Sequence, residues 1–318
     1  MPTPTHDFEP DLDQLTEEFT SLAVTDVDAA LALWDARSRR LGDELGAAWG
    51  ALILEGLRPA TRDALRSRPR GTTLLFTWST QRSQKPPMPR LPFFSPRLGY
   101  AYCASLVRQR GAAAARRALR EGCPLVVALR RDTSTLANNG RGLYDDHIVV
   151  LNGRGGLRSA RFFPGCTEPG AQYAQRAAPA ANGTRVDARY ADVRFKKADG
   201  VDIDKDGIAD AGRLVEGTYV FREKLGGFLG GRAFQSSTDQ VAERDTNGDG
   251  FFLRDDPKRI DAKGAGRSMY IHRGGDIATR DVNTWSAGCQ TLPKDIYAQF
   301  LATLGQPTSF CYVLINAR

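Results

Sequence analysis

Two residues near the end of the chain, His272 and Cys289, have the types and spacing of a base and a thiol nucleophile. They lie seventeen positions apart in the segment 268–292, which reads SMYIHRGGDIATRDVNTWSAGCQTL. A thiol attacks a carbonyl carbon when a nearby base takes its proton and N–H donors stabilise the oxyanion that forms. The turn Ser286-Ala287-Gly288-Cys289 offers such donors, and we expect the Ser286 hydroxyl to hold it by bonding the main chain. A structural turn with an incidental thiol fits the same residues about as well.

The other histidines and cysteines are weaker candidates. His147 follows two aspartates in a predicted strand, where a hydrogen-bonded structural role is favoured and a substrate-binding role is the alternative. Cys166 follows a glycine on a predicted turn and is the rival nucleophile, although no predicted helix follows it. The five cysteines lack CxxC spacing, and their odd number leaves at least one thiol outside any intramolecular disulfide framework. Three are interpreted as small buried side chains: Cys103, Cys123 and Cys311.

Two predicted elements would position the candidate pair. His272 closes an apolar run, 269–271, that is typical of a strand and ends in a flexible Gly-Gly turn. A helix is predicted over 293–304, with proline in its first turn and Gly305 as its terminator. Cys289 is therefore expected just before a helix N-terminus, where partial positive charge and free N–H groups favour a thiolate and an oxyanion.

The first part of the chain has a helical pattern. Apolar residues from Leu12 recur at helical spacing, and Thr25 with Asp28 predicts the cap of a second, longer helix. Glycines at every fourth position in that helix, Gly42, Gly46 and Gly50, lower its stability by up to about 1 kcal/mol each but permit close approach of another element. The run TTLLFT (72–77) predicts a strand, and the segment 85–96 is too rich in proline for regular structure.

The second half is β-rich. Apolar runs separated by Asn and Gly turns predict five strands, at 125–129, 147–151, 157–163, 214–221 and 310–315. The expected fold class is α+β, with a helical N-terminal region and a mainly antiparallel β domain. The predicted organisation is a helical accessory region with a Pro-rich linker (1–97), a connecting helix (98–121) and a catalytic domain (122–318).

Composition and charge restrict the classes of function. With 41% hydrophobic and 25% charged residues, the chain has the composition of a globular protein, and no apolar run approaches the ~20 residues of a membrane span. The first residues are acidic, which is atypical of a secretory signal. A net charge of +7 spread along the chain favours polyanions in general. Without a recognisable nucleic-acid-binding pattern, nucleic acid is not an expected partner.

The arrangement of His272 followed by Ser286-Ala287-Gly288-Cys289 resembles the signature of the L,D-transpeptidase (YkuD-type) catalytic domain. The upstream tripeptide Gly217-Thr218-Tyr219 resembles the Gly-x-Phe/Tyr strand of that family. Two positions depart from its pattern: Ala287 replaces a common His, and Gln290-Thr291 replaces an apolar residue followed by Arg or Asn. The chain is thus similar to a divergent SxGC branch, and residues 1 to about 120 are not covered by the resemblance.

The resemblance implies an L,D-transpeptidase-like β-sandwich and a set of roles. Cys289 would be the acyl-accepting nucleophile and His272 its base, with the backbone of Arg273 orienting the imidazole and the amides of Gly288 and Cys289 forming the oxyanion hole. The substrate class would be peptidoglycan stem peptides, cut at an L,D-peptide bond to give a thioester. An amine would resolve it in an L,D-transpeptidase and water in an L,D-carboxypeptidase, at the periplasm or cell wall. No redox or organic cofactor is expected.

Two acidic loops have the oxygen spacing of calcium loops. Asp202, Asp204, Asp206 and Asp210 occupy positions 1, 3, 5 and 9 of the first, with glycine at position 6. The second loop repeats the design with Asp245, Asn247 and Asp249 at positions 1, 3 and 5 and Asp256 at position 12. Both resemble EF-hand and dockerin-type loops, although Arg213 holds position 12 of the first and Leu253 position 9 of the second. Structural Ca²⁺ is one interpretation, and ordinary Asp, Asn and Gly turns are the other.

Two further hypotheses belong to other classes. The chain would be a calcium-stabilised cell-wall-binding or interaction protein if the SxGC turn is inert. An exported effector that degrades a competitor's wall is suggested by the N-terminal region and the atypical start. The sequence patterns leave the oligomeric state, the export route and the choice between amine and water open.

Overall fold

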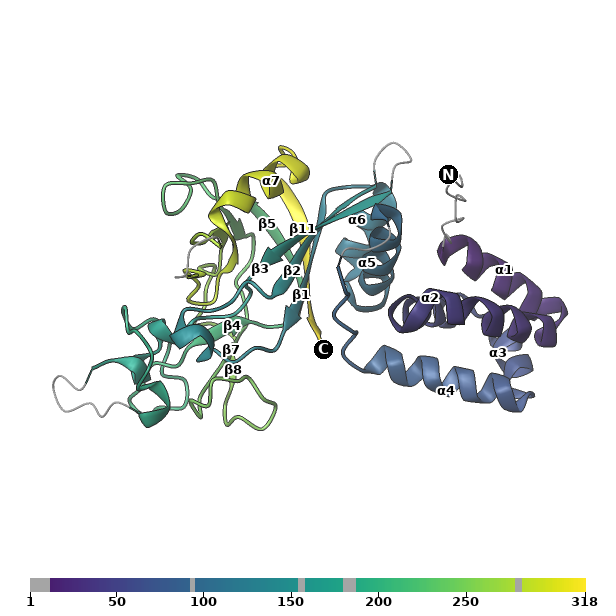
Figure 1. Ribbon diagram of the computed structural model, residues 1–318, viewed down its shortest axis with the longest axis horizontal. Helices are drawn as coiled ribbons and strands as arrows, with labels where there is room; N and C mark the ends of the chain where they lie inside the picture. Colours follow the sequence, from purple (N-terminus) through teal and green to yellow (C-terminus); the bar gives the residue numbers. More distant parts are fainter. Residues whose placement is uncertain (1–11, 92–94, 154–157, 180–186, 278–281) are drawn as a thin grey trace, which may run out of the picture. The chain divides into compact units, whose positions relative to one another are not determined.

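The computed structural model describes residues 12–91, 95–153, 158–179, 187–277 and 282–318 (Figure 1). His6 lies outside the described residues. The chain forms two compact units, the first made of Met1–Gly111, Leu151–Ala160 and Arg318, and the second of Ala112–Val150 and Arg161–Ala317. The main boundary thus follows Gly111, inside the segment predicted as one connecting helix.

The first unit is helical, as its sequence pattern predicts. Asp26, rather than Thr25, caps the long second helix, because its carboxylate accepts the Ala29 N–H at 2.9 Å. Gly42 has a φ of +70° and interrupts that helix. None of the helices in the described part of the chain is long and apolar enough to cross a membrane. The helices of this unit are α1 (Leu12–Thr25), α2 (Val27–Gly56), α3 (Pro59–Arg66), α4 (Pro69–Ser83) and α5 (Pro96–Arg110).

An aromatic cluster forms the core between these helices. The Trp34 and Trp49 rings stack with centroids 4.6 Å apart, and Trp78 packs edge-on against Trp34 at 4.8 Å. A Cβ built on Gly50 would lie 2.3 Å from the Trp78 ring, so only glycine admits the ring at this point. One of the three recurring glycines therefore permits the close approach that their spacing predicts.

The strand predicted over 72–77 is wrong, because the segment lies inside α4. Leu74, Leu75 and Trp78 are buried at helical spacing, and this packing overrides the β propensity of the threonines. The Thr73 hydroxyl donates to the Pro69 carbonyl at 3.0 Å and the Thr77 hydroxyl to the Thr73 carbonyl at 2.9 Å, so both fit the helix.

The single helix predicted over 98–121 is two helices. Helix α5 ends at Arg110 and α6 (Ala113–Glu121) begins after Gly111 and Ala112, both of which have extended backbone. Gly122 then ends α6 in the left-handed conformation, with a φ of +64°. Helix α5 belongs to the first unit and α6 to the second.

The second unit contains an eight-stranded mixed sheet with the order β10-β9-β6-β5-β11-β1-β2-β3. Two of its pairs, β1 with β11 and β10 with β9, are parallel, whereas β11 with β5, β5 with β6 and β6 with β9 are antiparallel. Strand β5 follows a short separate strand, so the run 214–221 is divided. The strands of this sheet are β1 (Leu125–Arg131), β2 (Asp146–Asn152), β3 (Ser159–Gly165), β5 (Gly217–Glu223), β6 (Phe234–Ser236), β9 (Ile271–Arg273), β10 (Gln290–Leu292) and β11 (Ser309–Ala317).

The two edges of this sheet approach each other, so that it nearly closes into a barrel. Cys166, just after β3, forms an antiparallel bridge with Thr291 of β10, with both N–H to carbonyl distances at 2.8 Å. The edge strand β10 is thereby held on both sides, by β9 and by this bridge. A small separate sheet has the order β4-β7-β8 and is formed by β4 (Gly212–Leu214), β7 (Ala242–Arg244) and β8 (Ile260–Asp261).

Helix α7 (Lys294–Leu304) packs on the large sheet and fixes the core behind the candidate site. The predicted helix over 293–304 is confirmed, with Pro293 as its N-cap and Gly305 as its C-cap. Its buried residues Tyr297, Phe300 and Leu304 join a cluster with the apolar faces of β1, β2 and β11. Four short 3₁₀ helices complete the described elements: η1 (Ala137–Gly140), η3 (Ala171–Tyr173), η4 (Gln175–Ala177) and η6 (Ala188–Tyr190).

Candidate active site

Two adjacent parallel strands bring His272 and Cys289 together. His272 is the middle residue of β9, and β10 pairs with it in the register Gln290 with Ile271 and Thr291 with His272. Cys289 directly precedes β10, and the register continues to it because the Gln290 N–H donates to the Tyr270 carbonyl at 2.7 Å. Both side chains line the same cavity.

The prediction that Cys289 lies just before a helix N-terminus is wrong. The buried strand 290–292 separates it from α7, which begins at Lys294. The effect of a helix dipole is confined to the first turn, so α7 supplies no charge stabilisation to this thiol. The sequence signal for the strand was short, since Gln290 and Thr291 are polar and their burial depends on partners elsewhere in the chain.

His272 is held in one tautomer. Its Nδ1 lies 2.7 Å from the Arg273 carbonyl oxygen, which can only accept, so Nδ1 carries the proton. The opposite atom, Nε2, is buried without a hydrogen-bond partner among the described residues and therefore presents a free lone pair. Phe228 packs edge-on against the imidazole with centroids 4.8 Å apart. Burial lowers the pKa of His272 from 6.5 to about 4, so the imidazole is neutral at pH 7.

The Cys289 thiol is protonated in the free protein. Sγ accepts the Tyr270 N–H at 3.4 Å and donates to the Ser268 carbonyl at 3.6 Å. Burial raises the pKa of Cys289 to about 12, against a smaller lowering by the Tyr270 N–H. The pair therefore rests as neutral thiol and neutral imidazole. No hydrogen bond joins Sγ to Nε2 among the described residues, so proton transfer between them requires the two side chains to rearrange.

The turn before Cys289 is held as its sequence suggests. The Ser286 hydroxyl donates to the Cys289 carbonyl at 2.8 Å and accepts the Gly288 N–H at 3.1 Å. Gly288 has a φ of +119°, and a Cβ there would lie 2.4 Å from the Gly212 carbonyl oxygen, so the turn requires glycine. Because Ser286 uses the Gly288 amide, the Cys289 amide is the candidate oxyanion donor.

Ala287 and Gln290, which depart from the L,D-transpeptidase pattern, lie in different surroundings. Ala287 lines the cavity, so its small side chain widens the space beside the thiol. Gln290 instead points into the protein, where its Oε1 accepts the Tyr312 hydroxyl at 2.7 Å and its Nε2 donates to the Gly288 carbonyl at 3.1 Å. Gln290 thus fixes the turn from behind and does not contact the cavity.

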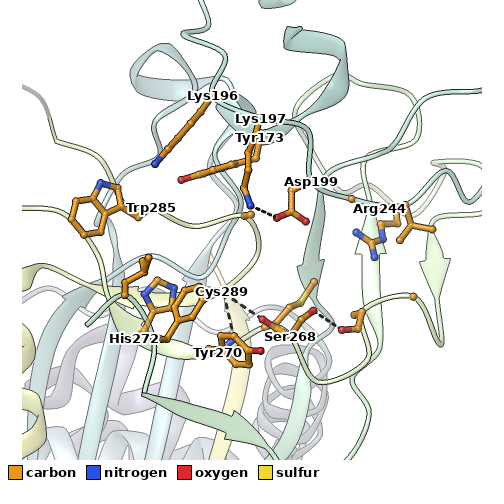
Figure 2. Close-up of a pocket in the computed structure, with 18 residues that line it drawn as sticks. Tyr173, Lys196, Lys197, Asp199, Arg244, Ser268, Tyr270, His272, Trp285 and Cys289 are labelled. Atoms are coloured by element: carbon orange, nitrogen blue, oxygen red, sulfur yellow. Dashed lines mark hydrogen bonds and ion pairs between the residues drawn. The ribbon is translucent and has the colours of Figure 1, made fainter. Parts of the chain in front are cut away.

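The cavity has a volume of about 490 Å³ and joins segments that are far apart in the sequence (Figure 2). Its lining includes the aromatic side chains of Tyr173 and Trp285 (Figure 2) and of Phe228, which come from three separate segments of the chain. Lys196 and Lys197 give it a basic rim, with the Lys197 ammonium 3.6 Å from the Asp199 carboxylate. These wall residues were missed from the sequence, because no spacing or motif connects them to His272 and Cys289.

The Gly-Gly turn after His272 packs closely against neighbouring segments. A Cβ on Gly274 would lie 2.2 Å from the Tyr144 hydroxyl, and one on Gly275 would lie 2.4 Å from the Asn283 carbonyl. The glycines therefore permit close packing of the loop 282–285 on the end of β9.

The other candidates lie away from this cavity. Cys166 is buried in the bridge to β10, where its Sγ donates to the Glu168 carbonyl at 3.2 Å, and burial raises the pKa of its thiol. His147 is half-buried on β2, edge-on to Phe162 at 6.0 Å. All five cysteines are free. Among the described residues, Cys289 is the cysteine that lines the cavity.

The predicted metal ligands form two neighbouring loops beside the small sheet. Carboxylate oxygens of Asp202, Asp204 and Asp206 lie within 4.8 Å of one another, a group that can hold a metal ion. In the second loop the Asn247 amide donates to Asp249 at 3.2 Å and to Asp256 at 2.9 Å. The clustered carboxylates of the first loop suit a hard divalent cation, whereas in the second loop the Asn247 amide nitrogen holds the carboxylates.

Comparison with known proteins gave no further identification. The chain matches no family model, no curated protein and no solved structure at a significant level.

Proposed function

We propose that this chain is a cysteine-dependent acyltransferase or hydrolase that acts on L,D-peptide bonds of peptidoglycan stem peptides, as a divergent relative of the L,D-transpeptidases. The observation that carries the proposal is the placement of Cys289 and of the unpartnered His272 Nε2 in one cavity by two paired strands. The curled sheet and the Gly-x-Tyr strand β5 are consistent with the β-sandwich that this relationship implies.

The reaction would begin from the neutral pair. When a substrate carbonyl lies over Cys289, the thiol proton passes to His272 Nε2 as Sγ bonds to the carbonyl carbon. The Cys289 amide binds the oxyanion. The C–N bond then breaks, the leaving amine takes the proton from the imidazolium, and a thioester remains. An acceptor amine or water attacks the thioester and gives its proton to His272, and the thiol is restored by that proton.

The cavity chemistry fits an acidic peptide. Lys196 and Lys197 at the rim, together with the +7 net charge, favour substrates that carry carboxylates, as peptidoglycan stems do. The aromatic side chains of Phe228 and Trp285 offer apolar walls for the peptide backbone. A site that admits an amine and excludes water would favour transfer over hydrolysis.

The test is to incubate the purified chain with disaccharide tetrapeptides and to measure the intact mass and the peptide products. We expect an acyl adduct that peptide mapping places on Cys289, together with shortened or crosslinked muropeptides. Cys289→Ala should abolish both, whereas Cys166→Ala, which removes a buried thiol outside the cavity, should keep them. An unmodified Cys289 with unchanged muropeptides would refute the proposal.

A second candidate is favoured by the environment of the thiol, in which burial raises the pKa of Cys289. A pKa of about 12 for Cys289 is opposite to the shift that activated cysteines show. If the turn is inert, the cavity binds wall peptides without reacting. In that case Cys289→Ala should retain full affinity for isolated cell walls in a pull-down, and the wild type should leave muropeptides unchanged.

A further inference from the structure

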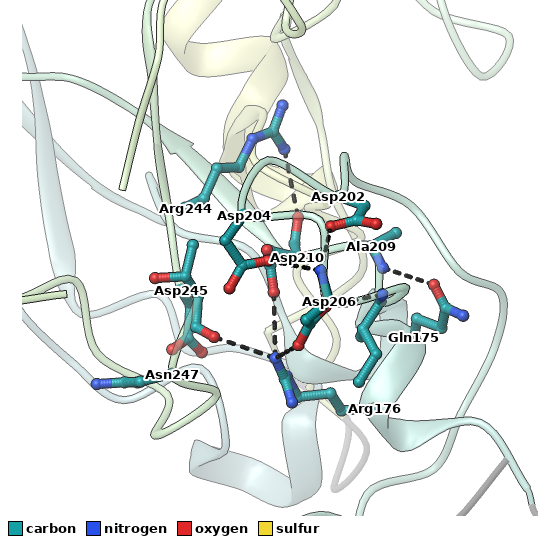
Figure 3. Close-up of polar contacts among 12 residues, drawn as sticks. Gln175, Arg176, Asp202, Asp204, Asp206, Ala209, Asp210, Arg244, Asp245 and Asn247 are labelled. Carbon is teal, nitrogen blue, oxygen red and sulfur yellow. Dashed lines mark hydrogen bonds and ion pairs between the residues drawn. The ribbon is translucent and has the colours of Figure 1, made fainter. Parts of the chain in front are cut away.

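The two acidic loops lie side by side at one end of the small sheet (Figure 3). The first loop, 202–210, leads into β4, and the second, 245–256, follows β7. These strands pair antiparallel, with Gly212 opposite Arg244, and the Asp245 N–H donates to the Ala211 carbonyl at 3.1 Å. The antiparallel pairing therefore places the end of one loop beside the start of the other.

Each loop contains a buried carboxylate oxygen that nothing in the described protein satisfies. Asp210 is 1% exposed and Asp245 is 2% exposed. Asp210 Oδ2 and Asp245 Oδ1 have no hydrogen-bond partner among the described residues. A buried, unpaired carboxylate oxygen is costly, and a bound cation removes that cost. Asp210 and Asp245 occupy positions 9 and 1 of their loops, where calcium loops carry ligands.

The other aspartates of the first loop lie close to Asp210. Asp210 lies next to the cluster of Asp202, Asp204 and Asp206, whose oxygens are within 4.8 Å of one another (Figure 3). The three carboxylates of this cluster and the neighbouring Asp210 share the guanidinium of Arg176, which pairs with Asp206 and Asp210.

Arg176 is the protein's own cation at this position, and it contacts both loops. Its Nη2 lies 3.1 Å from Asp206 Oδ2, 3.5 Å from Asp210 Oδ1 and 3.0 Å from the Thr246 carbonyl oxygen. A Cβ on Gly248 would lie 2.6 Å from the Arg176 side chain, so the second loop also packs on it. Arg176 therefore connects the loops, while one guanidinium leaves Asp210 Oδ2 unsatisfied.

Arg213, at position 12 of the first loop, is not available as a ligand or as a countercharge. Its guanidinium is buried and pairs with Glu243 at 2.9 Å, Glu168 at 2.8 Å and Asp132 at 2.8 Å. The first loop would therefore bind its ion with four aspartates and the carbonyl of Ile208 at position 7. The second would use Asp245, Asn247, Asp249 and Asp256.

The first loop is joined to the cavity wall. Asp210 and Val201 form an antiparallel bridge, with N–H to carbonyl distances of 3.0 and 3.4 Å. Asp199, Gly200 and Val201 line the cavity that contains Cys289. The Asp199 N–H also donates to the Tyr173 carbonyl at 2.7 Å, so the segment 199–201 connects the loop to a second wall residue.

We propose that these two loops bind Ca²⁺ as a pair and that the ion in the first loop orders the cavity wall at residues 199–201. The proposal does not depend on acyl transfer, because an inert binding cavity would be ordered in the same way. Calcium is favoured over Mg²⁺ because the loops offer many oxygen ligands from flexible turns, whereas Mg²⁺ demands a rigid octahedron and keeps its waters.

The test uses the full chain, analysed for bound metal as purified and then stripped with chelator. Titration calorimetry with CaCl₂ should give two sites, and MgCl₂ should bind at least tenfold more weakly. Asp210→Asn and Asp245→Asn should each remove or weaken one site at least tenfold. Asp204→Asn, at a half-buried ligand, serves as a second variant of the first loop in case Asp210→Asn does not fold. Asp192→Asn, at an exposed aspartate outside both loops, is the matched control and should keep both sites.

Amide hydrogen exchange measures the effect of calcium on the cavity wall at residues 199–201. Calcium should slow exchange of the Asp199 and Val201 amides in the wild type, and Asp204→Asn should weaken that response while retaining the one at the second loop. Absence of bound calcium, of binding heat at millimolar CaCl₂ and of any chelator effect on Tm would overturn the calcium sites. Calcium binding without slower exchange at 199–201 would overturn the link to the cavity.

Discussion

Replacing His272 with asparagine should remove a large part of the acid sensitivity of the second unit. Burial lowers the pKa of His272 from 6.5 to about 4. As the pH falls below 6.5, the unfolded chain takes up a proton that the folded chain binds only near pH 4. The folded state therefore loses stability over this window, by about 3 kcal/mol at pH 4. Asn keeps a donor for the Arg273 carbonyl but cannot titrate.

The measurement is urea unfolding at pH 7, 6, 5 and 4, with pulse-labelling hydrogen exchange of β1 and β11 to report on the second unit alone. The difference between wild type and His272→Asn isolates the imidazole, because the buried aspartates titrate in both. The wild type should lose about 3 kcal/mol relative to the variant between pH 7 and pH 4. His147→Asn is the matched control and should keep the decline, since His272 remains. Parallel curves for wild type and His272→Asn would refute a neutral, buried imidazole.

Three further results are expected. Gly50→Ala should destabilise the helical unit by about 1–3 kcal/mol because its Cβ meets a tryptophan ring. Gly46→Ala, whose Cβ would make only an ordinary contact with the Ser38 carbonyl oxygen at 3.8 Å, should be neutral or stabilise the unit by up to about 1 kcal/mol. Urea denaturation followed by tryptophan fluorescence measures both effects. Gly288→Ala should lower the free energy of unfolding by about 3 kcal/mol or more, because the cost of a positive φ adds to that of a backbone clash. Gly226→Ala, which has a positive φ but no clash, should lower it by about 1–2 kcal/mol. Equal losses of stability in the two variants would exclude the clash. Iodoacetamide should alkylate Cys289 more than tenfold more slowly at pH 8 than it alkylates a free cysteine, with a rate that rises up to about pH 12. Fast labelling at pH 8 would contradict the raised pKa of this thiol.

Local sequence patterns predicted a helix or strand correctly where the residues of that element alone determine its structure. The α+β class, the strands at 125–129, 147–151 and 310–315 and the helix after Pro293 follow from apolar periodicity, prolines and glycines in each segment. The segment 72–77 has the β-branched composition of a strand, yet it is a helix because Trp78 and its neighbours pack into the aromatic core. Packing between helices makes this segment helical, and the residues of the segment alone do not reveal that packing.

The candidate site likewise contains residues that the sequence predicts and an element that it does not. His272, Cys289 and Ser286 are recognisable by residue type and spacing, because their turn and strand are contiguous. The strand β10 is not, since burial of its polar residues depends on Tyr312 and on the bridge to Cys166.

The electrostatics of the site were likewise decided by the tertiary structure. A helix N-terminus at Cys289 would have favoured a thiolate, whereas the surrounding walls bury the imidazole and partly cover the thiol, which keeps both neutral. The acidic loops show the same contrast. Their ligand spacing is visible in the sequence, but only the folded chain pairs them, buries Asp210 and Asp245 and joins them to the cavity, because residues far apart in the chain supply that burial.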